Sequence, residues 1–155
     1  INGDVGDAAG YAMRGGKIFV RGNAGYRAGI HMKQYKDKKP VMVIGGVCGS
    51  FLGEYQAGGV IVVLNIDNES KPVGYFCGTG MHGGKIFIRG DISNIKLPSQ
   101  VNAQEASETD MLEVSCYVKE YCSLFNKNAD SILSERFYIL TPNTKNPYKQ
   151  MYVQN

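Results

Sequence analysis

The stretch MRGGKIFVRG, residues 13–22, returns as MHGGKIFIRG at residues 81–90, with eight of ten positions identical. A looser copy, QAGGVIVVLN, occupies residues 56–65 between them. In each copy two adjacent glycines precede a short run of mainly β-branched apolar residues. Repetition of this kind indicates that the chain is built from stacked structural units.

A second glycine pattern gives the length of one unit. Two glycines separated by three residues begin at Gly6, Gly25, Gly49 and Gly74, at intervals of 19, 24 and 25 residues. Each unit also contains one β-branched run that predicts a short strand. These runs lie at residues 18–20, 41–44, 61–64 and 86–88. Four short strands at this spacing predict a parallel β-helix, in which each coil stacks on the next.

Paired glycines are expected at the corners of the coils, because glycine adopts positive φ without steric cost. We predict that the pairs occupy equivalent corners in successive coils, since each precedes a β-branched run. The pairs are Gly15/Gly16, Gly58/Gly59 and Gly83/Gly84.

All 20 glycines lie at or before Gly90, and this break in composition divides the chain. We assign residues 1–95 to the glycine-rich β-helix and residues 96–155 to a helical extension with a C-terminal arm. Residues 105–126 have apolar side chains at intervals of three and four, which predicts a helix with Ser107 or Thr109 as its N-cap. A second short helix is expected from residue 129 or 130 to 135, and residues 137–155 are interpreted as an extended arm.

The apolar side of the long predicted helix must be buried against another surface. Its members are Met111, Val114, Val118, Tyr121, Cys122 and Phe125. The end or flank of the β-helix offers the nearest apolar surface and an open strand edge. We therefore predict that this helix is a cap.

Composition argues against several classes of protein. The net charge of +3 is too small to indicate nucleic-acid binding, and no apolar run approaches the roughly 20 residues of a membrane span. No signal-peptide pattern opens the sequence, so a cytoplasmic location is the default. The chain begins at Ile1 rather than at a methionine, and we expect that further sequence precedes it.

Basic residues are concentrated in the first part of the chain. Residues 1–90 carry 11 lysines and arginines against six acidic residues. The densest basic stretch contains Lys33, Lys36, Lys38 and Lys39 and is interpreted as a solvated loop, with a phosphate-binding or partner-docking patch as the alternative. Lys17 and Lys85, with Arg21 and Arg89, are expected to stack into two basic ladders on one outer face. Solubility or docking to an acidic partner would explain such ladders.

The residues that most often carry chemistry do not form a recognisable site. The four cysteines lack a CxxC pair and a nearby histidine, so we interpret them as buried free thiols in a reducing compartment. They are Cys48, Cys77, Cys116 and Cys122. GTGMHG at residues 78–83 matches GxGxxG, but a strand rather than a helix follows it, which argues against dinucleotide binding.

The histidines and carboxylates are likewise expected to be structural or solvated. His31 and His82 lie 51 residues apart without a nucleophile in a hydrolytic context, and His82 takes the place of Arg14 in the repeat, which indicates a surface position. Solvated corners are the interpretation for Asp4, Asp7, Glu54 and Asp67. We predict no catalytic, cofactor-binding or metal-binding residue in this chain.

Three segments carry a resemblance to a known family: VGDAAGYAMRGGKIFVRGNAGYRAGIHM at residues 5–32, GSFLGEYQAGGVIVVL at residues 49–64 and CGTGMHGGKIFIRG at residues 77–90. They resemble the GXGXG domain at the C-terminal end of the glutamate synthase large subunit. A related domain occurs in one of the subunits of formylmethanofuran dehydrogenase. The similarity spans residues 3–90, and PNTKNPYKQMYV at residues 142–153 is similar to stand-alone, archaeal-type versions of the domain.

The resemblance implies an all-β fold, a single-stranded right-handed parallel β-helix of about four coils with a C-terminal helical extension. It further implies a non-catalytic scaffold that spaces the glutaminase and FMN-dependent synthase parts of a glutamate synthase-type amidotransferase. FMN and an iron–sulfur cluster are then expected in the partner subunits, with no cofactor in this chain and no activity from it alone. Neither nucleic acid nor membrane is expected as a partner.

Three alternatives remain open at this point. The same scaffold role in formylmethanofuran dehydrogenase is the first. Self-association through the β-helix ends is the second, and it is compatible with either complex. The third is a small enzyme that uses an outer groove of the β-helix, which would need clustered charged residues on adjacent coils.

Overall fold

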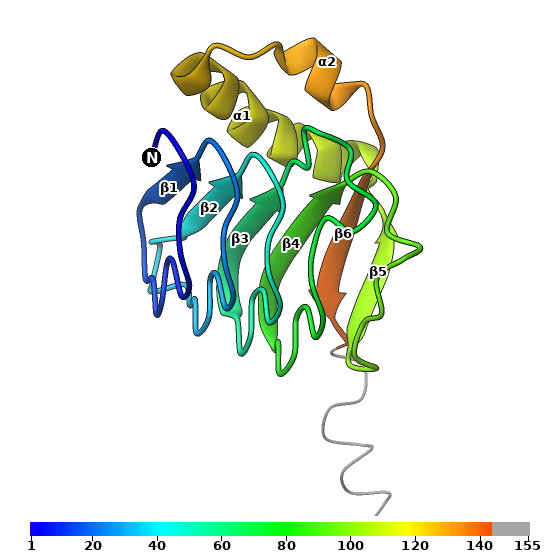
Figure 1. Cartoon of the computed structure of the whole chain (residues 1–155). Coiled ribbons are helices and arrows are strands. Elements are labelled where there is room, and N and C mark those ends of the chain that lie inside the picture. The colour runs from blue at the N-terminus through cyan, green and yellow to red at the C-terminus, as the bar shows by residue number, and fades with distance from the viewer. Residues whose placement is uncertain (144–155) are drawn as a thin grey trace, which may run out of the picture.

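The computed structural model describes residues 1–143, which form six strands and two helices (Figure 1). The strands are β1 (Lys17–Val20), β2 (Val41–Ile44), β3 (Ala57–Val63), β4 (Gly83–Arg89), β5 (Val101–Glu105) and β6 (Phe137–Pro142). The helices are α1 (Glu108–Phe125) and α2 (Ala129–Leu133). All strands belong to one sheet with the order β1-β2-β3-β4-β6-β5.

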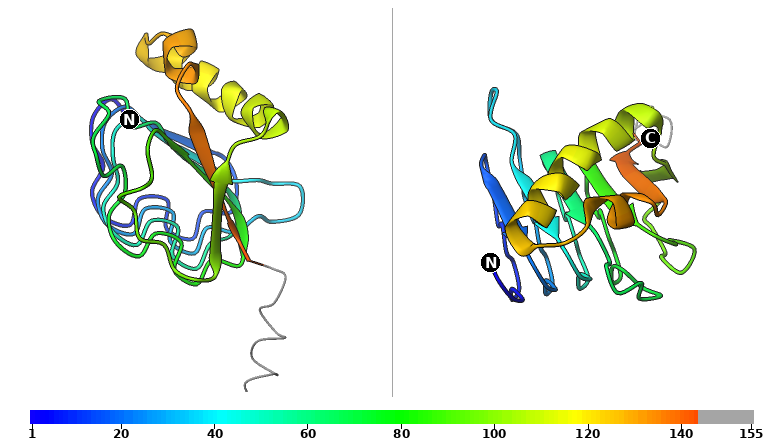
Figure 2. Two further views of the ribbon diagram at one scale, coloured as in Figure 1. Left: turned by 90° about the vertical axis from the view of Figure 1, so that its right-hand side faces the viewer. Right: turned by 90° about the horizontal axis from the view of Figure 1, so that it is seen from above.

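The four strands expected from the repeats are confirmed, and they pair in parallel. Lys17 lies beside Val41, Val41 beside Val60, and Val60 beside Lys85, so equivalent positions of the units are in register. Between neighbouring strands the chain makes a loop that leaves the sheet and returns, and successive loops lie against one another (Figure 2). Parallel isolated bridges join Val5 to Ala24 and Ala24 to Cys48 across these loops.

The expected all-β fold, a right-handed parallel β-helix with a helical extension, is wrong. The chain has a mixed α/β fold, in which β6 pairs antiparallel with both β4 and β5 and two helices cover the sheet. Sequence repetition identified the parallel strands but carried no information on the non-repeating strands. The stretch interpreted as an arm from residue 137 forms β6 up to Pro142, and residues 144–155 of that predicted arm lie outside the described residues.

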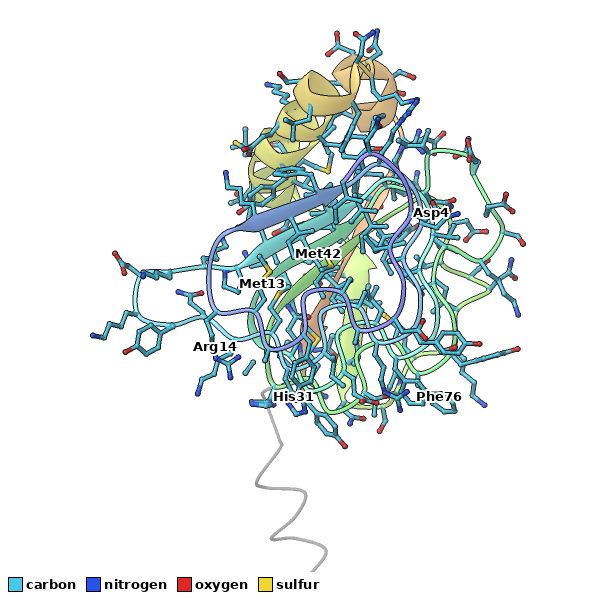
Figure 3. The ribbon with its side chains drawn as sticks, turned by 60° about the vertical axis from the view of Figure 1, so that its left-hand side comes forward. Asp4, Met13, Arg14, His31, Met42 and Phe76 are labelled. Atoms are coloured by element: carbon cyan, nitrogen blue, oxygen red, sulfur yellow. The ribbon has the colours of Figure 1, made fainter. Side chains whose placement is uncertain are left out.

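Two apolar layers follow from the alternation of side chains along the strands. Met42, Ile44, Ile61 and Ile86 point toward the loops and pack with loop residues such as Leu52. Figure 3 shows Met13 and Met42 in this space between sheet and loops. Residues of the opposite parity form the second layer, under α1: Val41, Val43, Val60, Val62 and Phe87.

Helix α1 crosses the outer face of the parallel strands obliquely (Figure 2, right). Its N-cap is Ser107, one of the two predicted caps, and Ser107 and Asp110 form a reciprocal capping box. Val114, Val118 and Tyr121 are buried against the sheet. The helix therefore covers a face of the sheet, whereas the edge of β4 is covered by β6. Within residues 1–143, neither helix is long and apolar enough to cross a membrane.

The loops contain a backbone pattern that repeats in every unit. Positive φ occurs at three alternate residues, such as Phe51, Gly53 and Tyr55 in the third unit. Their amides donate in alternation to the following and preceding loops: Phe51 to the Tyr75 carbonyl, Gly53 to the Ala28 carbonyl and Tyr55 to the Thr79 carbonyl. This alternation gives each loop a serrated edge with side chains directed outward at the positive-φ positions.

Candidate functional site

The prediction that Lys17 and Lys85 stack into a basic ladder is wrong, because Val41 of β2 and Val60 of β3 lie between them in the register of the sheet. Both lysines instead bind acidic side chains of α1. Lys85 and Lys39 both bind Glu113 of α1, with N–O distances of 2.8 and 2.7 Å, and Lys17 binds Glu120 at 2.9 Å. Burial raises the pKa of the Glu113 carboxyl, but hydrogen bonds from Lys39 and Lys85 outweigh it, so the pKa is lowered overall. These lysines therefore attach the helix to the sheet.

Arg21 and Arg89 do not form the second predicted ladder either, because Arg21 follows β1 and Arg89 ends β4, and β2 and β3 lie between those strands. Arg89 is buried, and its guanidinium donates to the carbonyls of Ile132 (2.8 Å) and Asn65 (3.2 Å) and to the side chain of Asn68. Burial lowers its pKa. Arg21 offers its backbone carbonyl to the Tyr121 hydroxyl, at 2.7 Å. Arg89 thus joins the end of α2 to the loop after β3.

The thiols and carboxylates lie largely, but not wholly, where the sequence placed them. Cys48, Cys77 and Cys122 are buried and free, whereas Cys116 is free but exposed, contrary to the expectation. Asp4 and Asp7 lie at exposed corners and accept the backbone N–H of Asn23 and Tyr26. Asp67 is likewise exposed.

Glu54 departs from the expectation that it lies at a solvated corner. It is buried and lies 3.5 Å from the Arg27 guanidinium. Among the described residues, no group of three or more His, Cys, Asp or Glu side chains is placed to hold a metal ion.

The last glycine of the GxGxxG string, Gly83, is the first residue of β4, so the string leads into a strand and does not open a helix. His31 and His82 are exposed, as expected for His82 from its place in the repeat. The Lys33 to Lys39 stretch is exposed and stands out from the molecule as a loop (Figure 2, left). In the part of the chain that the structure describes, neither histidine lies beside a nucleophile in a recognisable catalytic arrangement.

Sequence reasoning missed a surface of exposed aromatic side chains on the serrated loops. We call this surface the aromatic face and define it by Tyr11, Tyr26, Arg27, His31, Phe51, Tyr55, Tyr75 and Phe76. Four tyrosines and one phenylalanine of this face are exposed, with 47–64% of each residue's area accessible: Tyr11, Tyr26, Tyr55, Tyr75 and Phe76. Figure 3 shows His31 and Phe76 directed outward along one edge of the molecule, away from α1.

Neighbouring units stack their side chains along this face. The rings of Phe51 and Phe76 are stacked with centroids 5.1 Å apart, and the Arg27 guanidinium lies 4.4 Å from the Phe51 centroid. A second row stacks His31 on Tyr55, also at 5.1 Å, with Tyr11 edge-on to His31. The pair Arg27–Glu54 connects the two rows.

Beside the second row lies a shallow hollow of about 370 Å³. Tyr11, Tyr55 and His31 form its aromatic side, and Arg14, Lys33 and His82 supply its basic groups. Arg14 donates to the His31 carbonyl at 2.8 Å. The arrangement can bind an anionic group next to an aromatic surface.

The signal that could have revealed the aromatic face is the recurrence of large side chains at one repeat position. Arg27, Phe51 and Phe76 are separated by 24 and 25 residues, the length of one unit. The spacing of the glycines carries the same period, so the outward residues between them recur with each unit.

Comparison with known proteins identifies related sequences. Residues 2–143 match the GXGXG motif family. An uncharacterized protein of Methanocaldococcus jannaschii is 46% identical over 137 residues, which are 84% of this chain and 52% of that protein. The chain therefore spans about half the length of this relative.

Proposed function

This chain belongs to the GXGXG motif family and is a glutamate synthase-like domain at the level of that family; from this membership we propose that it is a non-catalytic scaffold of a glutamate synthase-type amidotransferase. In this proposal it spaces a glutaminase part, which releases ammonia, and an FMN-dependent synthase part, which uses the ammonia with 2-oxoglutarate. FMN and an iron–sulfur cluster belong to those partners. The family match over residues 2–143 is the observation that carries the proposal.

The use of charged side chains in the described structure supports a scaffold. Lys17, Lys39 and Lys85 attach α1 to the sheet, and Arg89 attaches α2. Each of these basic groups is engaged in holding the fold rather than presented to a substrate. A domain of this construction supplies a rigid surface on which partners can be placed at a fixed distance.

Reconstitution tests the scaffold role directly. The tagged full chain is co-expressed with the glutaminase and synthase chains from the same source, and we expect all three to co-purify. Glutamate formation from glutamine and 2-oxoglutarate is then compared with and without this chain. We expect that omitting it leaves glutamine hydrolysis but uncouples the released ammonia from glutamate formation.

Two results would contradict the proposal. The first is full coupling of the two catalytic chains in the absence of this one. The second is glutamine hydrolysis by the purified chain that disappears on Cys48→Ala or Cys77→Ala substitution. Co-purification with molybdenum or tungsten subunits instead would transfer the scaffold role to a formylmethanofuran dehydrogenase-like complex.

A further inference from the structure

We propose that the aromatic face is the surface by which this chain binds a partner protein whose contact region combines carboxylates with apolar side chains. The inference rests on the scaffold role proposed above, because the expected partners are the glutaminase and synthase chains. It adds the location of the contact and the chemistry of the surface that fits it.

The exposure of its aromatic side chains is the first argument that the aromatic face binds a partner. Large exposed apolar patches are uncommon on soluble monomers and often mark interaction sites. Tyrosine, phenylalanine and arginine are also enriched in protein interfaces. Tyr26, Tyr75 and Phe76 meet this description, since each residue has more than half of its area accessible.

The backbone provides a second, independent argument. Phe51, Tyr55 and Phe76 have φ values of 62, 56 and 60°, a region that is unfavourable for bulky side chains and favourable for glycine. Gly80 shows that glycine is accepted at the position equivalent to Tyr55. The backbone therefore does not require these rings, and strained residues of this kind concentrate at functional sites.

Charge identifies the chemistry of the partner. Arg14, Lys33 and Lys71 are exposed on or beside the aromatic face. The nearby carboxylates are already engaged, because Glu54 lies beside Arg27 and Asp7 accepts the Tyr26 amide. An acidic surface complements this arrangement, and the hollow beside Tyr11 and Tyr55 can receive a carboxylate side chain.

The positive φ values allow a test that keeps the fold. The variant Tyr55→Gly/Phe76→Gly removes two rings and relaxes the backbone at both positions. The matched control, Leu112→Ala/Leu124→Ala, removes two exposed apolar side chains from α1. Tyr55→Phe, which keeps the ring, serves as the conservative variant. Thermal unfolding confirms that each full-length variant is folded.

Binding of each purified variant to the glutaminase chain and to the synthase chain is measured by biolayer interferometry. We expect the glycine double variant to bind one of these two chains at least about tenfold more weakly than the parent does, because interfaces depend on a few large anchor residues. Leu112→Ala/Leu124→Ala and Tyr55→Phe should bind like the parent. Lys33→Glu/Lys71→Glu should weaken binding more at about 50 mM than at about 500 mM NaCl, and more than Lys119→Glu does.

The outcomes separate this inference from the scaffold role. If the parent binds a catalytic chain and the glycine variant binds equally well, the aromatic face is not the contact and only this inference fails. If the parent binds neither chain, both proposals fail. Loss of self-association, or of binding to a labelled single-stranded oligonucleotide, in the glycine variant alone would assign the face to a second copy or to nucleic acid and overturn the inference.

Discussion

At Gly84 the backbone and the packing both exclude a side chain. Its φ is +80°, and a Cβ there would lie 2.8 Å from the Gly59 carbonyl oxygen and from the Gly58 carbonyl carbon. The equivalent Gly16 and Gly59 also have positive φ, so the second glycine of each pair adopts the same conformation. The predicted corners are not found for two of the pairs, because Gly58/Gly59 lies within β3 and Gly83/Gly84 begins β4. The sequence predicts the positive φ at the second glycine of each pair because it is a property of the local backbone, whereas the close contact with Gly58 and Gly59 comes from the neighbouring strand.

Replacing Gly84 by valine should therefore lower the free energy of unfolding by about 1–3 kcal/mol. Urea unfolding followed by circular dichroism measures the change. Gly6→Ala is the control, because a Cβ at Gly6 would meet nothing within 4 Å and its φ is not positive. Equal unfolding midpoints for Gly84→Val and the parent would show that this position is not constrained.

Burial should make two of the cysteines unreactive in the native chain. It raises the pKa of the Cys77 thiol to about 12 and that of Cys48 further still. With Ellman's reagent at neutral pH we expect rapid reaction at the exposed Cys116, whereas Cys48 and Cys77 should react only after unfolding. Labelling of Cys48 or Cys77 at the rate of Cys116 would contradict this account.

The same pKa shifts predict how stability depends on pH. The native state holds the Cys48 and Cys77 protons more tightly than the unfolded chain does, since both pKa values are raised from an ordinary value of 9.0. This contribution is present below pH 9 and is lost as the pH rises above it. The free energy of unfolding should therefore decrease as the pH rises above 9. In the variant Cys48→Ala/Cys77→Ala this decrease should be smaller.

Ion pairs join helix α1 to the sheet, and the sequence pattern did not predict them. The period of the apolar residues predicted the helix and its buried side, because both are properties of one contiguous segment. The pairs Lys39–Glu113 and Lys85–Glu113 connect residues 74 and 28 positions apart, so no local pattern could have identified them. Strand β6 was missed for the same reason: FYILTP becomes a strand because β4 offers it an edge.

Glu113→Gln should weaken the attachment of α1 by about 1 kcal/mol, because one carboxylate serves two lysines. Glu120→Gln is the comparison, since its single pair with Lys17 is more exposed, and its effect should be smaller. Thermal unfolding at low and high salt measures both changes. Equal losses for the two variants would contradict a special role for Glu113.

Measuring the unfolding of the same variants over a range of pH tests the direction in which the pKa of Glu113 is shifted. The pKa of Glu113 is lowered in the folded chain, so its contribution is present above the ordinary value of 4.5 and is lost as the pH falls through the folded pKa. The difference between the parent and Glu113→Gln should therefore shrink in acid. A difference that grows in acid would show that the two lysines do not stabilise the carboxylate.

The described chain has three layers, with the sheet between the loops and helix α1. Loops cover one face of the sheet, and α1 covers the other. The number and order of the parallel strands followed from the repeats. The mixed character of the sheet did not, because it depends on how the last described strand closes the edge of β4.

A chain ending at residue 105 should retain parallel β-structure but associate with itself. It lacks α1, α2 and β6, which leaves Val43, Val62 and Phe87 uncovered together with the edge of β4. Sedimentation velocity over a range of concentrations measures the association, with a chain ending at residue 143 as the control. A monomeric truncated chain with an unchanged melting temperature would show that these elements are not a cover.

The place of β6 between β4 and β5 has a consequence for biosynthesis. β5 leaves the ribosome about 30 residues before β6, yet its place in the sheet exists only after β6 has paired with β4. A nascent chain can therefore assemble its first four strands and pack α1 on them during translation, but β5 can join the sheet only after Pro142 has cleared the exit tunnel. Premature termination between β4 and β6 would release a polypeptide in which the edge of β4 is still open to a neighbouring chain, and such products should be preferred clients of chaperones and proteases.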